Sequence, residues 1–286
     1  VGTWNTCKAQ YRYSFDLGLQ PVKFSAPLST GILGHDALAE YYKAIQAGAS
    51  PGEAALEARK VLSAAMADSS RYDLEVVTGV DRILSVYFQQ NLKDLSNWRI
   101  LEVEEQHELP LTDQFSMPMR LDLMVELRRE KVNVLVDHKF TYDFWTEDDL
   151  ALNPQFPKYL GALRNSGIQI DHTILNQIRT RKLKNTGPDD LVRRSIQRPS
   201  NAKIRRALKE HIIASQEIVE YRALPDAVRP EVATRVLNKM ICRGCFVKSL
   251  CMAEFDGGDI QYLAQNEYTT RTYGYNDDTT KIEDLL

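Results

Sequence analysis

The sequence lacks three features that would place it in particular classes of protein. Its longest apolar runs are far too short to span a bilayer, and its first ten residues do not have the layout of a signal peptide. It also has no G-x-x-x-x-G-K-[ST] phosphate loop, which excludes a P-loop motor within this chain. We therefore expect a cytoplasmic protein that does not bind membranes.

Cysteine is scarce, with four in 286 residues: Cys7, Cys242, Cys245 and Cys251. Without an export signal, disulfides are not expected. The last three cysteines are spaced C-x₂-C-x₅-C, whereas zinc sites more often show two C-x-x-C pairs. Four thiolates suit either tetrahedral zinc or a [4Fe–4S] cluster, so the residues alone leave both open.

What is present is typical of a soluble globular chain, with 43% apolar and 26% charged residues. The sequence shows no internal repeat and no low-complexity linker. The spacing of apolar residues predicts helices over Gly31–Ala47, Pro51–Met66, 72–95, 153–165 and 201–240. Strands are predicted over Arg99–Leu109, Arg120–Arg128, Val132–Lys139 and His172–Arg181. This pattern indicates an α/β fold with a small mixed sheet, followed by a loosely packed polar tail from Asp256.

Two of the predicted strands carry charges that a buried strand does not usually tolerate. Asp122 lies in the first, RLDLMVELR, and Asp137 lies near the end of the second, VNVLVDHK. Because strand side chains alternate, Asp137 and Lys139 share a face while His138 points away. Burying an unpaired carboxylate costs several kcal/mol. The set indicates a divalent-metal site, and exposed strand-end charges are the alternative.

Three more residues can be directed at the same point. His35 lies early in the first long helix, and neutral imidazole is a common ligand of divalent metals. Gln155 and Tyr159 lie one helical turn apart on one face. Taken singly, such a histidine is more often a core residue, and such a pair is more often ordinary surface. The order of the whole set along the chain is what distinguishes it.

That order resembles the RecB-type branch of the PD-(D/E)XK nuclease superfamily. The resemblance runs through four motifs: Gly31-x-x-x-His35, Arg120-Leu121-Asp122, Asp137-His138-Lys139 and Gln155-x-x-x-Tyr159. One cysteine before this core and three after it is similar to the layout of the iron–sulfur subgroup, which includes the AddB nuclease domain and the exonuclease of CRISPR adaptation. The resemblance covers about residues 1–255 and implies a restriction-endonuclease-like core whose helical ends are joined by a [4Fe–4S] cluster, with zinc as the alternative.

The resemblance also implies roles for the site residues. Mg²⁺ or Mn²⁺ would be held by the side chains of His35, Asp122 and Asp137 and by the main-chain carbonyl of His138. Lys139 would act beside the metal, and Gln155 and Tyr159 would hold the DNA or the geometry of the site. Glu105, on the preceding strand, is a candidate ligand for a second metal.

Basic residues are concentrated in one segment, although the net charge of the chain is −3. Such a segment can neutralise phosphates, but most charge runs are simply solvated. We expect DNA contacts from Arg179, Arg181, Lys182, Arg193, Arg194 and Arg198. The expected organisation is one nuclease domain over residues 1–255, with a helical part (1–97), a core (98–182), a helical and cysteine-bearing part (183–255) and a tail (256–286).

The resulting hypothesis is a metal-dependent DNA nuclease. The resemblance favours an exonuclease on single-stranded ends with 5′→3′ polarity. A structure-specific or nicking endonuclease is the first alternative, and a non-catalytic DNA-binding module is the second. Because the chain has no motor of its own, a helicase, a recombinase or a CRISPR-adaptation protein is the kind of protein partner that we expect.

Overall fold

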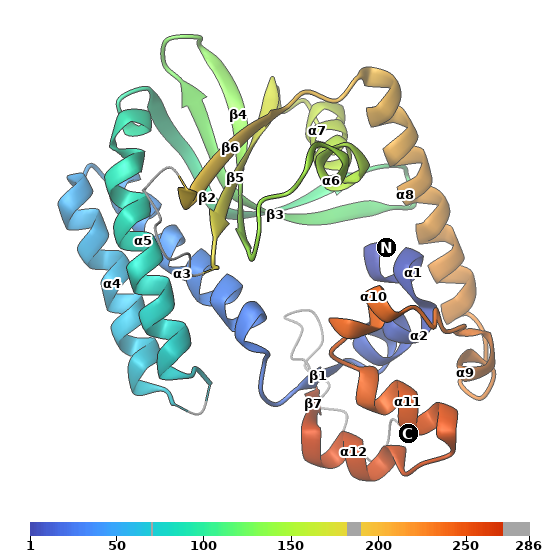
Figure 1. Cartoon of the computed structure of the whole chain (residues 1–286). Coiled ribbons are helices and arrows are strands. Elements are labelled where there is room, and N and C mark those ends of the chain that lie inside the picture. The colour runs from blue at the N-terminus through green and yellow to red at the C-terminus, as the bar shows by residue number, and fades with distance from the viewer. Residues whose placement is uncertain (70, 182–189, 271–286) are drawn as a thin grey trace. The chain divides into compact units, whose positions relative to one another are not determined.

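The computed structural model describes residues 1–69, 71–181 and 190–270, which form two compact units (Figure 1). Residues 25–209 make up the first, which we call the sheet unit. Residues 1–24 and those from 210 onward make up the second, which we call the terminal unit. Helix α8 (Asn201–Arg222) begins in one and ends in the other. The single nuclease domain expected from the sequence stays a prediction, and each unit is described by itself.

The sheet unit contains a five-stranded mixed sheet with helices on both faces. Its strands are β2 (Trp98–Pro110), β3 (Ser116–Leu127), β4 (Val132–Thr141), β5 (His172–Arg179) and β6 (Val192–Gln197), in that spatial order. Only β4 and β5 run parallel. Its helices are α3 (Ala26–Gln46), α4 (Pro51–Ala67), α5 (Leu74–Leu95), α6 (Glu147–Leu152) and α7 (Gln155–Asn165). This confirms the predicted α/β class and the mixed sheet.

Two hydrophobic clusters lie on opposite faces of this sheet. The first packs α3, α4 and α5 against Val134 and Val136 of β4. The second packs α7 and the start of α8 against Leu135 of the same strand. Strand β4 is thus covered on both faces, as its nearly continuous apolar sequence requires. Any polar side chain near its end must therefore be paired or serve a site.

Several predicted boundaries need correction. Helix α3 starts at Ala26, five residues before the predicted Gly31, because Pro27 suits a first helical turn. The predicted start of α4 is confirmed, with Ser50 and Glu53 forming a capping box. Strand β3 extends back to Ser116, and strand β6 was not predicted at all. The predicted helix over 153–165 is α7, preceded by the separate helix α6.

The terminal unit joins the two ends of the chain. Its N-terminal elements are α1 (Gly2–Thr6), α2 (Lys8–Tyr11), a π-helical turn (Arg12–Asp16) and β1 (Leu19–Pro21). From the C-terminal side come the end of α8, α9 (Arg229–Val232), α10 (Lys239–Arg243), α11 (Lys248–Asp256), α12 (Ile260–Glu267) and β7 (Tyr268–Thr270). Strand β1 pairs antiparallel with β7.

The C-terminal stretch departs from two sequence predictions. The predicted helix over 201–240 is broken after Arg222, because Pro225 and Pro230 cannot continue it. The loosely packed tail predicted from Asp256 is wrong as far as Thr270, since α12 and β7 are ordered and Tyr268 is buried. Residues 271–286 lie outside the described residues.

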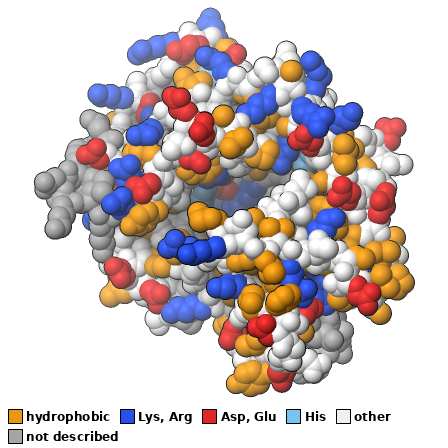
Figure 2. All heavy atoms as spheres, turned by 45° about the vertical axis from the view of Figure 1, so that its right-hand side comes forward, with side chains coloured by type: hydrophobic (Ala, Val, Ile, Leu, Met, Phe, Trp, Pro, Cys, Tyr) orange, Lys and Arg blue, Asp and Glu red, His pale blue; other side chains and the backbone are white. Residues whose placement is uncertain are grey.

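The surface carries charges of both signs. On the face shown in Figure 2, acidic and basic side chains are interspersed, in keeping with the small net charge of −3. Among the helices of the described residues, none is both long enough and apolar enough to cross a bilayer.

Candidate metal centre

The site forms where β3 and β4 separate. Their pairing ends at Leu123 and Val136, so the backbone of β4 beyond that point no longer meets a partner strand on this side. The freed N–H of His138 donates instead to Oδ2 of Asp122 at 2.7 Å. A buried main-chain donor needs such a partner, and here the side chain of Asp122 supplies it. This bond holds the Asp122 carboxylate at the gap between the strands.

The same point interrupts the alternation of both β2 and β3. On β3, Leu123 packs in the first hydrophobic cluster but Leu121 packs in the second, although the two should share a face. On β2, Val103 and Leu109 are six positions apart and should also share a face, but Val103 packs in the first cluster and Leu109 in the second. Between them Glu104 has a left-handed backbone, with φ of 51°. A non-glycine residue in this conformation costs of order 1 kcal/mol or more and recurs at functional sites.

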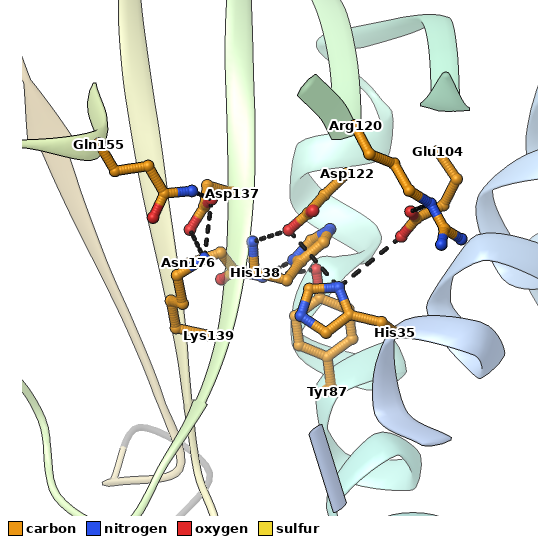
Figure 3. Close-up of polar contacts among 10 residues, drawn as sticks. All are labelled: His35, Tyr87, Glu104, Arg120, Asp122, Asp137, His138, Lys139, Gln155 and Asn176. Atoms are coloured by element: carbon orange, nitrogen blue, oxygen red, sulfur yellow. Dashed lines mark hydrogen bonds and ion pairs between the residues drawn. The ribbon is translucent and has the colours of Figure 1, made fainter. Parts of the chain in front are cut away.

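Helix α3 brings His35 to this gap (Figure 3). Its Nδ1 lies 3.6 Å from Oδ2 of Asp122 and 3.7 Å from Oε1 of Glu104. Ligand atoms of these three residues all lie within 4.8 Å of one another, which is the spacing of a set that can hold one metal ion. The helix approaches β4 closely at Gly34, where an added Cβ would lie 2.2 Å from the Phe140 ring.

Glu104 is the site residue that sequence analysis missed. The hypothesis pointed to Glu105, whose side chain is exposed, whereas Glu104 is largely buried and forms an ion pair with Arg120, whose Nε lies 2.5 Å from Glu104 Oε2. Simple alternation could not have found it, because the left-handed backbone at Glu104 redirects the side chain. The positive φ at a non-glycine residue is not visible in the sequence.

Asp137 lies beside this group, held by two partners that sequence analysis did identify. Lys139 Nζ is 2.8 Å from its Oδ2, and Gln155 Nε2 donates to its Oδ1 at 2.9 Å (Figure 3). Tyr159, one turn after Gln155, packs against the second hydrophobic cluster, and burial followed by the nearby Asp137 raises its pKa. The structure therefore places Gln155 against the carboxylate and Tyr159 at the margin of the site.

The electrostatics of the site favour a cation. Burial, then the negative charge of Asp137, raises the pKa of Asp122 to about 6. Burial alone lowers the pKa of His35, but the carboxylates of Glu104 and Asp122 outweigh it, so the net shift is upward. The pKa of Lys139 is likewise raised by Asp137 and Asp122 against the effect of burial. Carboxylates crowded in this way are stabilised by positive charge.

The His138 side chain belongs to the opposite face of β4. Its Nδ1 accepts from Nδ2 of Asn176 at 2.8 Å, and its ring stacks on Tyr42 with centroids 5.6 Å apart. The same Asn176 amide lies 2.9 Å from the hydroxyl of Tyr87. Burial, then the charge of His35, lowers the pKa of His138 well below its usual range. The ring is therefore neutral and structural, and only the main chain of His138 faces the site.

Strand β6 sends two adjacent arginines to opposite faces. Arg193 lies opposite Gln177, and Arg194 lies opposite Asn176. Arg194 forms an ion pair with Asp94 and donates to Oδ1 of Asn176 at 3.2 Å. The guanidinium of Arg194 thus joins the network beside His138, and its predicted contact with DNA stays a prediction.

The other predicted DNA-binding residues do not form one patch. Arg179 and Arg181 lie at the end of β5, whereas Arg198 contacts Asp171 at 3.3 Å, just before that strand begins. Eight strand residues separate these places, which corresponds to about 25 Å. Lys182 lies outside the described residues.

The four cysteines line a single pocket of the terminal unit. None is in a disulfide, and apolar side chains including Val236, Leu237 and Ile241 form much of the remaining wall. Burial raises the pKa of the Cys245 and Cys251 thiols. The fold thus brings cysteines that are far apart in sequence to the wall of one pocket, although no three sulfur atoms of these four described residues lie within 4.8 Å of one another.

Comparison with known proteins decides the family. The family model described as the PD-(D/E)XK nuclease superfamily matches residues 1–252. The chain belongs to the PD-(D/E)XK nuclease superfamily. Membership implies a nuclease that acts on nucleic acid and suggests dependence on a divalent metal, which the group formed by His35, Glu104 and Asp122 can bind. No curated protein matches the sequence.

One solved structure similar to this superfamily member is titled "Crystal structure of SSO0001". The two chains are 13% identical, with a TM-score of 0.33, and the match covers 81% of this chain and 87% of the other. The family assignment rests on the match over residues 1–252.

Proposed function

We propose that the chain is a divalent-metal-dependent DNA exonuclease that acts on single-stranded ends. The observation that carries this proposal is the convergence of His35, Glu104 and Asp122 beside the Asp137–Lys139 pair. Oxygen and imidazole donors suit Mg²⁺ or Mn²⁺. Bound there, the ion would lower the pKa of a water and offset charge on the scissile phosphate.

The residues of the site have distinct roles in this proposal. The metal would be held by His35, Asp122, Asp137 and the main-chain carbonyl of His138, with Glu104 as an additional ligand. Lys139 directs a positive charge to the same point and can stabilise negative charge that develops on the phosphate. Gln155 orients Asp137 through its amide. The peptide N–H of His138 orients Asp122.

Digestion of end-labelled linear DNA and closed circular single strands, with Mg²⁺ or Mn²⁺, tests this function. We expect nucleotides to be released from linear single strands and the circles to survive, since an exonuclease needs an end. Asp137→Ala should abolish release, whereas Asp113→Ala, which changes an exposed carboxylate in a loop, should not. Cutting of the circles would favour the endonuclease alternative. An Asp137→Ala variant that stays active would refute the site.

Polarity can be read from the same digestion. The resemblance to RecB-type exonucleases favours 5′→3′ degradation, so a label at the 5′ end should be released early and a label at the 3′ end late. Early release of the 3′ label would instead indicate 3′→5′ degradation, and the proposed metal site would still stand. Loss of metal-dependent cleavage on every substrate, with DNA binding retained, would favour a non-catalytic DNA-binding module.

We further propose that the chain belongs to the iron–sulfur subgroup of RecB-type nucleases, with a [4Fe–4S] cluster held by Cys7, Cys242, Cys245 and Cys251. The pocket that all four cysteines line supports this proposal. Iron and sulfide analysis of anaerobically purified protein should give about four irons per chain, and Cys242→Ser should lower that content. A colourless protein containing zinc would replace the cluster with the zinc alternative.

A further inference from the structure

The loop after β4 carries two aromatic rings covered by guanidinium groups. The Phe144 ring has the Cζ of Arg179 at 3.9 Å and that of Arg193 at 4.3 Å from its centroid. The Tyr142 ring has the Cζ of Arg181 at 5.5 Å. We call these five residues the aromatic–arginine platform. Three cations gathered on two rings form a surface suited to a flat, anionic ligand.

The platform continues the face of the sheet that bears the site. In the parallel register of β4 and β5, Lys139 lies opposite Gln177 and Thr141 lies opposite Arg179. Arg193 lies opposite Gln177 on the other side of β5, so it shares the face of Lys139. Arg179 follows Gln177 by two residues and therefore lies on that face as well. Tyr142 follows Lys139 by three residues, which corresponds to about 10 Å of strand. A polymer bound at the metal centre can therefore extend onto the platform.

The loop is held in place by the sheet. The buried side chain of Gln177 accepts through Oε1 from the N–H of Trp145 at 2.6 Å. Thr141 Oγ1 donates to the main-chain carbonyl of Asp143 at 2.6 Å. The Asp143 side chain also lies 3.3 Å from Nη1 of Arg181. A loop anchored in this way presents its aromatic rings without a large ordering cost.

We propose that the platform is a base-stacking subsite for single-stranded DNA next to the metal centre. Tyr142 is 67% exposed, so its ring can stack on a base. The guanidinium groups of Arg181 and Arg193 supply the charge that a phosphate backbone needs. Bases in the interior of a duplex are stacked on both sides and offer no free face, so this subsite selects unpaired strands. The inference rests on the proposed function, because the bound strand is its substrate.

Binding of a fluorescently labelled poly-dT strand tests the subsite without cleavage. The full-length Asp137→Ala protein in EDTA serves as background, and anisotropy gives Kd. We expect Tyr142→Ala to weaken binding at least about fivefold, because one base–aromatic stack is worth about 1–3 kcal/mol. Tyr142→Phe, which keeps the ring, should bind like the background protein. Tyr262→Ala, which removes a similarly exposed tyrosine of the terminal unit, should also leave Kd unchanged.

The same variants on a blunt DNA duplex complete the test. Duplex binding should be insensitive to Tyr142→Ala. Unchanged binding of poly-dT by Tyr142→Ala, or an equal loss for strand and duplex, overturns the subsite. Cleavage by the wild-type protein is scored separately. A protein that cuts DNA but binds poly-dT independently of Tyr142 refutes only the subsite, and one that depends on Tyr142 but never cuts refutes only the nuclease proposal.

Discussion

Strand β4 places polar residues on both of its faces, and the two faces use them differently. On one face, Asp137 and Lys139 form an ion pair next to the Asp122 carboxylate, and the pKa values of Asp122 and Lys139 are shifted upward. On the other face, the His138 ring is buried and neutral, with a hydrogen bond to Asn176 and a stacking contact with Tyr42. Consecutive residues of one strand thus serve a charged site and a neutral scaffold.

The difference shows how a buried polar residue can be assigned a role. Asp122 lies close to the carboxylates of Glu104 and Asp137, and a bound cation would stabilise these three negative charges. The network beyond His138 is made largely of neutral groups that satisfy one another, which is the usual way to bury polarity in a core. Substitutions on the first face should therefore change activity, and those on the second should change stability.

The largest expected effect is on the charged face. Asp137→Asn should lower the rate of DNA cleavage about a thousandfold, since metal-linked charge stabilisation is worth several kcal/mol. The midpoint of thermal unfolding should change little, because losing the ion pair with Lys139 is offset by removing the repulsion between Asp137 and Asp122. Initial rates and calorimetric melting check both parts. A large loss of stability would make Asp137 structural and break the comparison.

On the neutral face, His138→Ala should cost about 2–4 kcal/mol of unfolding free energy, because it leaves a cavity and removes one of the hydrogen-bond acceptors of the Asn176 amide. Urea unfolding measures this cost. His107→Ala on β2, which removes a histidine paired with Glu102 near the surface, should cost under about 1 kcal/mol. A His138→Ala protein that is fully stable but inactive would place the ring in the chemistry.

Packing on the neutral face also positions the charged one. Gly34→Ala should destabilise the fold by about 1–3 kcal/mol and displace His35, because the new methyl group would overlap the Phe140 ring. Gly31→Ala, in the same helix with open space around it, should be neutral or stabilise by up to about 1 kcal/mol. Urea unfolding and Mn²⁺ affinity, measured for both variants, test this prediction. Equal stabilities of the two variants would mean that α3 can move away from Phe140 of β4 without cost.

The smallest effect concerns Glu104, the proposed ligand that sequence analysis missed. Glu104→Gln should weaken Mn²⁺ binding about tenfold, a loss typical of one polar group around a metal. Glu105→Gln, at the exposed neighbour, should leave the affinity unchanged. Isothermal titration of the two variants compares them directly. The reverse result would return the role to Glu105.

Part of the geometry of the candidate site was visible in the sequence because it follows local rules. Alternation in β4 put Asp137 and Lys139 on one face and His138 on the other, and helical spacing put Gln155 and Tyr159 on one side of a helix. These relations depend only on period and neighbouring residues. The sheet and most of its flanking helices followed from the same periodicities.

The remainder depended on contacts that no local pattern encodes. Glu104 reaches the site through a left-handed backbone, and Arg194 contacts Asn176 because β6 pairs with β5 at a particular register. Strand β6 itself was hidden by its basic residues, which are typical of a solvated segment. The ordered stretch up to Thr270 was missed because its partner, β1, lies at the other end of the chain.

That pairing of β1 with β7 has a consequence for how the protein is made. Residues 1–24 are translated before the sheet unit, yet the strand and helices that complete their own unit are translated after it. At about 5–20 residues per second, the N-terminal segment waits for roughly ten seconds or more before its partners emerge. We expect the sheet unit to fold first on the nascent chain and the cysteine pocket to close only after Cys242, Cys245 and Cys251 have emerged. Proteolysis of ribosome-stalled chains of increasing length would show protection in that order.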